Sequence, residues 1–370
     1  MREATLMNKN KPVMKCIIDG TTIIKINEVI DKDMLPIVLI DNISEQKATE
    51  WLRGRIIPDK RDGLKEARNY FQKFECYKNM FSLSDQYWFT YKRTEKWENM
   101  NFFTNDYSED IGKIFFAPWE VKKIIENPDL TTNGVLRKRW TRKNGKNYLI
   151  KAGSRRAGQD PISEVLASMV LEQIHIIPFV RYDMVIDGIN ICCICENFID
   201  ENTEYVPAGH IYEREPRKDN ESVTEHMVRM AESYGIEGAA DFIEKMVVAD
   251  HFICNSDRNL GNFGFIRSAE TGKIERFAPI FDCGSAFFDL KSSKSSFNEA
   301  EEKAIEKYMP ELTKSKLDKK ALFNLIDAYP KISEIEARDI KGKINKVFDE
   351  IKAAEKSSIE NLKEDDLLFM

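Results

Sequence analysis

A change of pattern near residue 205 limits what this chain of 370 residues can fold into. Before it, short apolar runs are separated by the turn-forming pairs Asn144–Gly145 and Asp187–Gly188, which predict two β-hairpins. Between the hairpins, residues 160–174 place apolar side chains at helical spacing. After residue 205 the helical spacing continues through most of the chain. A strand-rich part followed by a helix-rich part predicts an α+β protein with two lobes.

The helix between the hairpins has clear start signals. Asp160 is predicted to cap it, and Pro161 follows at the first helical position, where proline is tolerated. We expect the hairpins and this helix to form one lobe, with a five-stranded type of sheet, over residues 128–205. The second, helical lobe is expected over residues 206–356, and the acidic segment 357–370 is expected as a tail.

Residues 1–120 predict a further small α+β unit. Apolar runs on either side of Asp19–Gly20 indicate a hairpin, and Ser44 is placed to cap a helix. Residues 66–74 continue in a helical pattern, and the aromatic segment 81–93 is predicted to lie in the core. No function follows from these residues.

Composition indicates a globular protein and argues against several function classes. Hydrophobic residues make up 42% and aromatic residues 11% of the chain, too much for a disordered protein. The net charge of −6 is not that of a nucleic-acid or membrane-surface binder. Seven cysteines without a regular framework favour a reducing compartment, with Cys192 and Cys195 as buried thiols. No apolar run approaches the roughly 18 residues that cross a bilayer, so we expect a cytoplasmic protein.

Three oxygen-bearing side chains form the chemical signature of the chain. Asp257 and Asn262 lie five residues apart in the segment DRNLGN, and Asp282 follows the apolar run APIF. Carboxylate and amide oxygens are the ligands that Mg²⁺ prefers, and the spacing D-x-x-x-x-N matches a kinase catalytic loop. The pattern therefore predicts phosphoryl transfer, with one Asp orienting the attacking hydroxyl and the other two side chains holding metal.

Two further features supply what a metal–phosphate site needs. Lys151 lies on the second strand of the first predicted hairpin, and Glu164 lies on the following helix. A strand lysine paired with a helix glutamate is the ion pair that kinases require. The loop TTNG at residues 131–134 precedes the hairpin, and Gly134 permits close approach of its backbone to phosphate. This loop lacks both G-x-G-x-x-G and the Walker pattern, so it is the weakest of these signals.

Each of these residues also has a plainer interpretation. Asp257 and Asn262 are common in turns, Lys151 could be a solvated lysine at a strand edge, and Glu164 could be a surface carboxylate. Their order along the chain favours the kinase interpretation, because six features in the right order are hard to obtain by chance.

The segments NSDRNLGNFGFIR and FAPIFDCGSAFF resemble the catalytic core of the HipA-like serine/threonine kinases, most closely the branch of cell-translocating kinase A. The resemblance covers roughly residues 128–350 and implies that ATP and Mg²⁺ are the cofactors. It implies Asp257 as the catalytic aspartate, Asn262 and Asp282 as metal ligands, Lys151 with its partner Glu164 and the loop residue Gly134 at the nucleotide phosphates, and Glu196 and Phe198 at the adenine hinge.

The chain also departs from the toxin members of this family. Asn259 stands where those members usually place a histidine or another polar residue, which leaves the substrate open. Toxin members carry an inhibitory autophosphorylated serine in the phosphate loop, and Thr131 and Thr132 occupy the comparable region here. The serines at residues 289–297 are a second hypothetical site of autophosphorylation.

These observations predict an ATP- and Mg²⁺-dependent serine/threonine protein kinase that acts on a protein substrate. An antitoxin or another regulatory partner and a role in a toxin–antitoxin pair follow from the resemblance alone. Two alternatives stay open: a kinase-like binding module with weak activity, and a lipid or small-molecule kinase. Residues 137–156 contain nine Lys or Arg and no Asp or Glu, yet we expect them to face phosphates, an acidic partner or solvent rather than nucleic acid.

Overall fold

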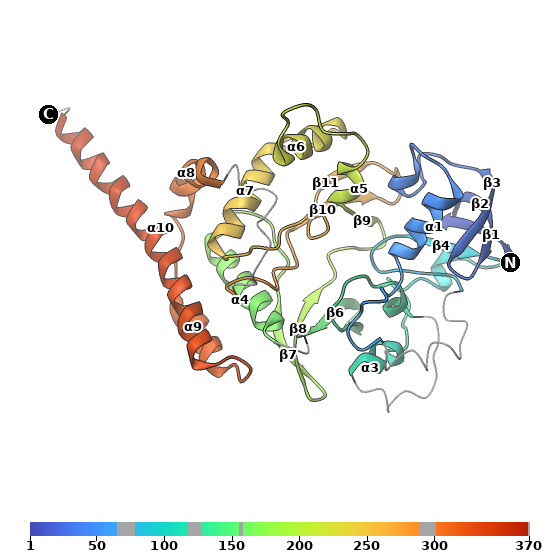
Figure 1. The fold of residues 1–370 in the computed structure, drawn as a ribbon, viewed down its shortest axis with the longest axis horizontal. Helices are drawn as coiled ribbons and strands as arrows, with labels where there is room; N and C mark the ends of the chain where they lie inside the picture. Colours follow the sequence, from blue (N-terminus) through green and yellow to red (C-terminus); the bar gives the residue numbers. More distant parts are fainter. Residues whose placement is uncertain (65–77, 117–126, 155–157, 289–300, 369–370) are drawn as a thin grey trace.

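The structure, a computed structural model, describes residues 1–64, 78–116, 127–154, 158–288 and 301–368. The helix expected at residues 66–74 and the serines at 289–297 lie outside these ranges. In Figure 1 the N-terminal sheet and the C-terminal helices lie at opposite ends of the molecule, with the two hairpins and their helix between them. The fold is α+β, as predicted from the change of pattern along the chain.

Four antiparallel strands form the N-terminal sheet. They are β1 (Arg2–Asn8), β2 (Lys11–Asp19), β3 (Thr22–Val29) and β4 (Tyr87–Thr90), in the order β3-β2-β1-β4. β2 and β3 meet at the predicted turn, where Gly20 has a φ of +57° that suits glycine. Helix α1 (Glu45–Gly54) packs on β3, and the Ser44 hydroxyl caps it by accepting the Lys47 N–H at 3.2 Å. The predicted hairpin and helix cap are confirmed.

The aromatic side chains of residues 81–93 lie in the core or pack against it, as predicted. Phe81 stacks on the fully buried Trp88 with ring centroids 4.9 Å apart. The Trp88 indole N–H donates to the Lys9 carbonyl at 2.7 Å, so the polar group of this buried ring has a hydrogen-bond partner. The 3₁₀ helices η1 (Ile37–Leu39) and η2 (Trp97–Asn99) and helix α3 (Asp110–Phe116) complete this part of the chain.

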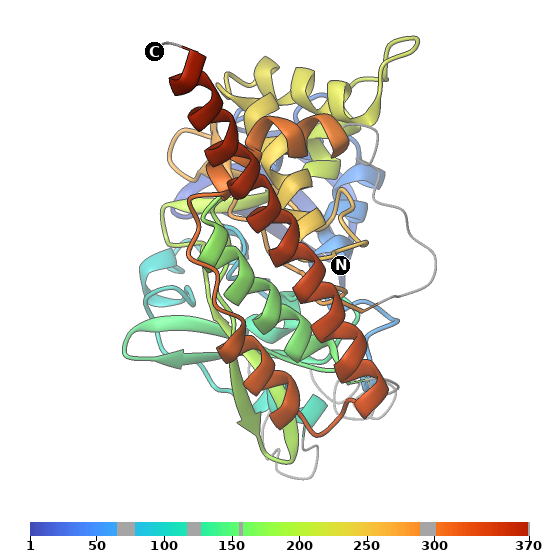
Figure 2. The same ribbon diagram turned by 90° about the vertical axis from the view of Figure 1, so that its left-hand side faces the viewer.

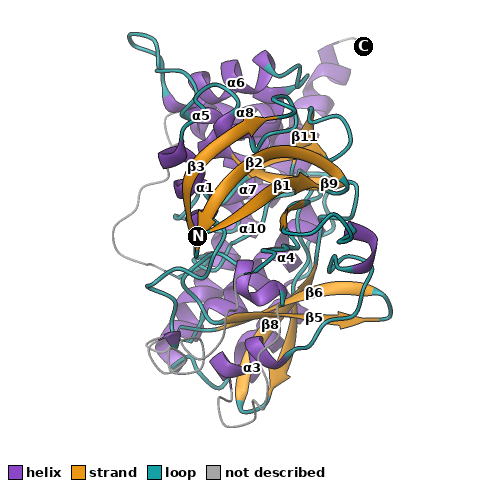
Figure 3. Ribbon diagram, turned by 90° about the vertical axis from the view of Figure 1, so that its right-hand side faces the viewer, coloured by secondary structure: helices purple, strands orange, loops and turns teal. Residues whose placement is uncertain are grey.

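The second sheet is built from the two predicted hairpins. Its strands are β5 (Lys138–Lys143), β6 (Lys146–Ala152), β7 (Asp183–Asp187) and β8 (Asn190–Glu196), in the order β5-β6-β8-β7. Figure 3 shows this sheet set apart from the N-terminal strands. Helix α4 (Asp160–Ile174) packs against β6, β7 and β8. Cys192 and Cys195 are free thiols buried in β8, as predicted.

Two details of the second sheet differ from the prediction. Asp160 is not the helix cap: Gln159 holds that position, and the Asp160 carboxylate accepts the Ser154 N–H at 2.8 Å instead. The sheet has four strands in the described residues, not five. β8 has neighbours on both sides, so the next strand, β9 (Thr203–Pro207), has no free edge of β8 to join and pairs elsewhere.

β9 forms a third, three-stranded sheet with strands from the helical part of the chain. β10 (Gly264–Ser268) is its central strand and pairs antiparallel with both β9 and β11 (Ile274–Phe277). The buried Arg267 on β10 donates to Glu204 at 2.7 Å and to the Tyr87 hydroxyl at 2.8 Å. Because Tyr87 belongs to the N-terminal sheet, this arginine joins the two sheets.

The rest of the chain is helical. The helices are α5 (Ala208–Tyr212), α6 (Val223–Ser233), α7 (Ala239–Phe252), α8 (Glu301–Leu312), α9 (Lys319–Ala328) and α10 (Glu334–Leu368). α10 packs against α8 and α9 and runs diagonally across one side of the molecule in Figure 2. It continues without a break into the segment expected as a tail from residue 357. None of the described helices combines the length and hydropathy that a membrane span needs.

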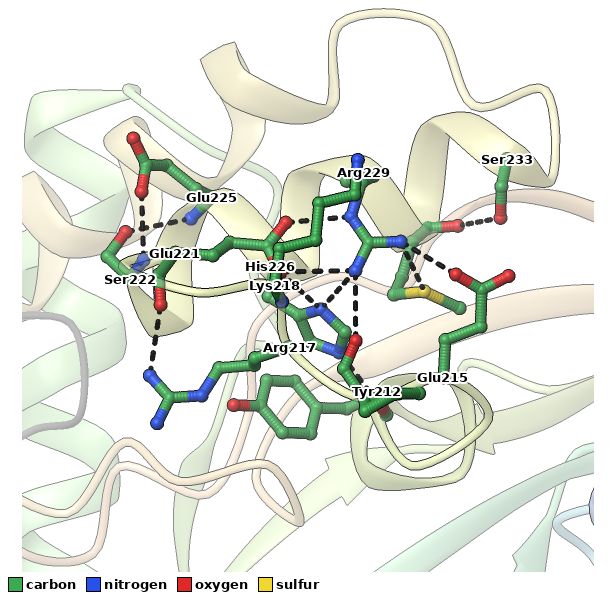
Figure 4. A network of polar contacts seen from close by, with 12 residues as sticks. Tyr212, Glu215, Arg217, Lys218, Glu221, Ser222, Glu225, His226, Arg229 and Ser233 are labelled. Carbon is green, nitrogen blue, oxygen red and sulfur yellow. Dashed lines mark hydrogen bonds and ion pairs between the residues drawn. The ribbon is translucent and has the colours of Figure 1, made fainter.

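A network of ion pairs fixes the start of α6 against the loop that follows α5 (Figure 4). Ser222 and Glu225 form a capping box at the helix start. The fully buried His226 ring lies 2.9 Å from the Tyr212 carbonyl through Nε2 and 2.8 Å from Arg229 through Nδ1. Arg229 in turn donates to Glu221 at 2.7 Å, so every buried polar group of this cluster has a partner.

Candidate active site

Lys151 lies where the second sheet meets the helical part of the chain. Its side chain is 6% exposed, and its ammonium donates to Glu164 on α4 at 2.8 Å and to Asp282 at 2.9 Å. Burial opposes the positive charge, but Asp282 and Glu164 together raise the pKa of Lys151 well above its usual range. The predicted strand-lysine and helix-glutamate ion pair is therefore present, and it includes a second carboxylate.

Glu164 connects three segments of the chain. Its side chain is 2% exposed; one oxygen accepts from Lys151, and the other accepts the Cys283 backbone N–H at 2.8 Å. Glu164 is thus a buried linker between β6 and the loop that carries Asp282, which excludes the surface-carboxylate interpretation.

Asp282 combines exposure with an unusual backbone. Its side chain is 41% exposed, and its φ of +59° lies in the left-handed region that a non-glycine residue rarely adopts. The Lys151 ammonium holds the pKa of the Asp282 carboxyl well below its usual range. One oxygen of Asp282 contacts Lys151, so the carboxylate is ionised, held in place and accessible to a ligand.

The loop with Asp257 and Asn262 has its own set of hydrogen bonds. Asp257 is exposed, and its carboxylate accepts from the Asn259 amide at 3.2 Å. The Asn262 amide nitrogen donates to the Asp257 carbonyl at 2.8 Å, which leaves the amide oxygen of Asn262 as the atom able to bind a cation. Asn259, two positions after Asp257, therefore helps to orient the Asp257 carboxylate.

Arg258 joins this loop to the segment that ends at Asp282. The guanidinium donates to the Asn262 carbonyl and to the Phe281 carbonyl, both at 2.7 Å. It is 1% exposed and forms a two-pronged ion pair with Asp250 on α7, at 2.9 and 2.8 Å. The Asp257 loop and the Asp282 segment are therefore held by one buried side chain.

Arg258 and Asp250 are site residues that the sequence interpretation missed. The signal was a single carboxylate, Asp250, inside the apolar stretch KMVVADHFI of α7. A buried carboxylate requires a cation, and Arg258 is eight residues away in the segment predicted to be catalytic. Sequence spacing alone does not show that the same guanidinium also holds two backbone carbonyls.

The loop with Gly134 is held from the N-terminal unit. Gly134 has a φ of +100°, which requires glycine, and its carbonyl accepts from the Arg61 guanidinium at 2.7 Å. Arg61 also donates to the Thr132 carbonyl, and the Asp62 N–H donates to the Val135 carbonyl at 2.8 Å. Nothing in the sequence pattern predicted this clamp, because it joins segments about seventy residues apart.

Thr131 and Thr132 are poorly placed for modification in this arrangement. Both are buried, at 6% and 7% exposure. The Thr131 hydroxyl donates to the Phe81 carbonyl at 2.7 Å, and the Thr132 hydroxyl donates to the Pro128 carbonyl at 2.9 Å. Phosphorylation of either residue requires this packing to open.

The two residues expected at the adenine hinge lie differently. Phe198 packs against Phe281, the neighbour of Asp282, with ring centroids 5.4 Å apart. Glu196 pairs across the sheet with Tyr148, which lies three residues before Lys151 on β6. Because this separation is odd, the Glu196 side chain belongs to the opposite face of the sheet from Lys151. There it forms an exposed ion pair with Lys146 at 2.8 Å. Only the backbone of Glu196 is left to contact a base near Lys151.

The basic hairpin is largely neutralised by acidic neighbours. Its described ion pairs are Arg137 with Asp62, Arg139 with Glu109 and Asp187, Arg142 with Asp106, and Lys146 with Glu196. A surface whose cations are paired within the chain offers little to a nucleic-acid backbone.

A buried carboxylate under the Gly134 loop gives a pH-dependent prediction. Asp129, in the 3₁₀ helix η4 (Pro128–Thr131), is 1% exposed, and burial raises its pKa to about 7. The folded state then binds the proton more tightly than the unfolded chain, so its stability falls as pH rises through this range. Asp129→Asn keeps an acceptor for the Trp140 N–H but carries no charge.

We expect the wild type to lose roughly 2–3 kcal/mol more stability than Asp129→Asn between pH 5 and pH 8. Urea unfolding of both proteins at the two pH values measures this difference. The exposed Asp219→Asn is the matched control and should follow the wild type. A constant gap between wild type and Asp129→Asn at both pH values would show that Asp129 does not change its protonation state between pH 5 and pH 8, contrary to this prediction.

Known proteins resemble this chain in sequence over a short segment and in structure over most of its length. No protein-family model matches the chain. A segment of 47 residues is 49% identical to serine/threonine-protein kinase CtkA of Helicobacter pylori strain J99, which is 13% of this chain and 14% of that protein. The crystal structure of the H. pylori proinflammatory kinase CtkA aligns over 63% of this chain and 95% of its own, with 17% identity and a TM-score of 0.49.

A second solved structure aligns over nearly the whole chain. It comes from the complex of HipA, HipB and operator DNA of the Shewanella oneidensis MR-1 toxin–antitoxin system. The alignment covers 95% of this chain and 97% of that chain, with 12% identity and a TM-score of 0.56. At this identity the likeness concerns the fold, and it extends over nearly the whole chain, the N-terminal sheet included. The chain therefore has the fold of the HipA-like kinases.

Proposed function

We propose that the chain is an ATP- and Mg²⁺-dependent protein kinase of HipA-like type that phosphorylates serine or threonine. The observation that carries the proposal is the contact of Lys151 with both Glu164 and Asp282, at 2.8 and 2.9 Å. Kinases need a lysine at the nucleotide phosphates and a metal-binding aspartate, both in fixed positions. Here the buried Lys151 ammonium contacts the proposed metal-binding residue Asp282, and Glu164 fixes the position of that ammonium.

The donor set near Asp282 fits Mg²⁺. No three His, Cys, Asp or Glu side chains form a metal cluster in the described ranges, so a metal would rely on Asp282 and the Asn262 amide oxygen. Mg²⁺ in kinases uses such a small protein set and takes its other ligands from phosphates and water. When bound, it would neutralise charge on the phosphates.

The remaining residues have roles that follow from their positions. Asp257 is exposed beside Asn262 and would orient the acceptor hydroxyl and accept its proton. Lys151 would hold the nucleotide phosphates, with the Gly134 loop approaching them from the other hairpin strand. Phe198 would pack near the base, and the backbone at residues 196–199 would contact it.

A protein partner is part of the proposal. The structurally similar HipA chain was solved together with HipB and operator DNA. We infer that this chain also has a regulatory protein partner of the antitoxin kind, and that direct contact with nucleic acid is not its role, since most of the described charges of the basic hairpin are paired internally. Autophosphorylation and a cytoplasmic location, the latter supported by the free buried thiols, belong to the same proposal.

Labelled ATP tests the proposed function directly. The purified chain is incubated with γ-labelled ATP and Mg²⁺, alone and with a cell lysate, and the products are separated into protein, lipid and small molecules. We expect label on serine or threonine of protein, abolished by EDTA. Label in lipid or in a small molecule would instead support the other kinase class, and bound nucleotide without any labelled product would support a binding module.

The variant Asp282→Asn tests the role proposed for Asp282 in this reaction. Because it removes the charge of the proposed metal ligand, we expect phosphate transfer to fall at least about a hundredfold. Asp219→Asn, an exposed aspartate outside the site, should keep wild-type transfer. Transfer within a few-fold of wild type in Asp282→Asn would contradict the role assigned to Asp282.

A further inference from the structure

One short segment of the N-terminal unit contacts both sides of the candidate active site. This bridging segment, residues 81–87, ends where β4 begins. At its start, the Phe81 carbonyl accepts from the hydroxyl of Thr131, in the region that leads into the second sheet, at 2.7 Å. At its end, the Tyr87 hydroxyl accepts from Arg267, on the central strand of the third sheet, at 2.8 Å. The bridging segment therefore spans the distance between the two sheets.

Gln86 makes the central contact of the bridging segment. The chain passes from β8 of the second sheet to β9 of the third through a linker, residues 197–202. The Gln86 amide nitrogen donates to the Asp200 carbonyl at 2.8 Å and to the Thr203 carbonyl at 3.0 Å. Gln86 is only 2% exposed, so packing keeps its side chain in place. One buried amide thus holds the end of the linker and the start of β9.

Two further hydrogen bonds place the linker alongside the bridging segment. At the start of the linker, the Asn197 amide nitrogen donates to the Leu83 carbonyl at 2.9 Å. Just beyond the linker, the Tyr205 N–H on β9 donates to the Ser84 carbonyl at 2.8 Å. The linker is therefore bonded to the N-terminal unit along its length, and it cannot bend as a hinge without breaking these contacts.

The angle at the linker affects the candidate active site. Lys151 belongs to the second sheet, whereas Asp282 follows the third sheet in the chain, and their charged groups are 2.9 Å apart. A rotation of one sheet relative to the other would separate these two groups. A misplacement of about 1 Å far from the chemistry can cost a reaction about a hundredfold in rate.

We propose that Gln86 is a positioning residue for phosphate transfer, which acts through the linker to hold the two sheets at the angle that brings Lys151 and Asp282 together. The proposal rests on the proposed function, because it takes these two side chains to be parts of a kinase site. It gives the N-terminal unit, whose sequence suggested no function, a role in the reaction without contact with the substrate.

Single-turnover transfer from γ-labelled ATP to protein tests the proposal in the variant Gln86→Met. Methionine fills a similar volume but donates neither hydrogen bond, so we expect transfer at saturating ATP to fall about ten- to a hundredfold. Asn197→Asp cannot donate to the Leu83 carbonyl and should also lower transfer, which tests the same connection from the linker. All proteins are compared at a temperature where circular dichroism shows them folded.

Thr49→Val is the matched control for a loss of hydrogen bonds within the N-terminal unit. The buried Thr49 hydroxyl accepts from the Ile23 N–H at 3.0 Å and donates to the Ile23 carbonyl at 3.4 Å. Valine has nearly the same shape and removes both bonds, as Gln86→Met removes two, but neither bond involves the linker. Thr49→Val should transfer phosphate like the wild type.

The distance between the two sides of the site gives a readout that does not depend on activity. Spin labels are attached through a ketone-bearing amino acid at the exposed positions of Lys143 on β5 and Glu232 on α6, so that the native cysteines are not labelled. Electron paramagnetic resonance should give one narrow distance distribution for the wild type and for Thr49→Val. We expect a broader distribution for Gln86→Met.

Each other result decides against the assignment. Equal transfer by Gln86→Met and Thr49→Val would overturn it. Lower transfer with an unchanged distance distribution would also overturn it, because Gln86 would then act on the linker alone and not on the angle between the sheets. If the wild type transfers no phosphate, the proposed function fails. A broader distribution in Gln86→Met would then still support its hold on the two sheets, and an unchanged distribution would overturn that as well.

Discussion

Asp257→Asn is expected to lower phosphate transfer by about 10²–10⁴-fold, the usual contribution of a positioned general base. The asparagine keeps the size of the side chain and still accepts the hydrogen bond from Asn259. It cannot accept a proton from the attacking hydroxyl. Since Asp257 is exposed and makes no contact with Lys151, Glu164 or Asp282 among the described interactions, ATP affinity should stay near the wild-type value.

This combination separates a catalytic role from a binding role. Single-turnover transfer and ATP titration are measured on the same protein preparation, with Asp219→Asn as the exposed control. A lower kcat with unchanged affinity supports the assignment. Near-normal transfer by Asp257→Asn would contradict the catalytic role of Asp257, and a loss of ATP binding would place Asp257 in the nucleotide site instead.

Local turn chemistry explains why much of the fold was predictable. The pairs Asn144–Gly145 and Asp187–Gly188 specify hairpins through the backbone conformations they permit, whatever surrounds them. The Ser44 cap is equally local. The ion pair of Lys151 with Glu164 was predictable for another reason, since a strand and the helix that follows it are adjacent in space. The roles of these residues in catalysis stay predictions.

Contacts between distant segments were not predictable in the same way. The Arg61 clamp on the Gly134 loop joins two units of the chain, and the choice of β9 to pair with β10 depends on β8 having both edges occupied. The face of the sheet on which the Glu196 side chain lies depends on where β8 begins in the strand alternation. A difference of one residue reverses the face, and the residue pattern of this segment does not exclude it. Asp160 shows the same limit within one segment. Its residue type is suited to a helix cap, but its carboxylate accepts the Ser154 N–H and does not cap the helix.

Arg258→Met is expected to be the most destabilising single change at the site. Methionine fills part of the space, but it leaves the Asp250 carboxylate buried without its cation. Removal of one partner from a buried ion pair typically costs about 3–5 kcal/mol. The Asn262 and Phe281 carbonyls also lose their shared donor, so the Asp257 loop and the Asp282 segment are no longer held together.

Two further variants separate stability from positioning. Asp250→Asn combined with Arg258→Met removes the uncompensated charge and should recover part of the free energy of unfolding, because the Asn255 amide still has an acceptor at position 250. Phosphate transfer should stay low, since neither substitution restores the donor to the two carbonyls. The exposed Arg276→Met should match the wild type in both measurements. If the double variant regains wild-type transfer, Arg258 serves stability alone, and the catalytic segments hold their positions without it.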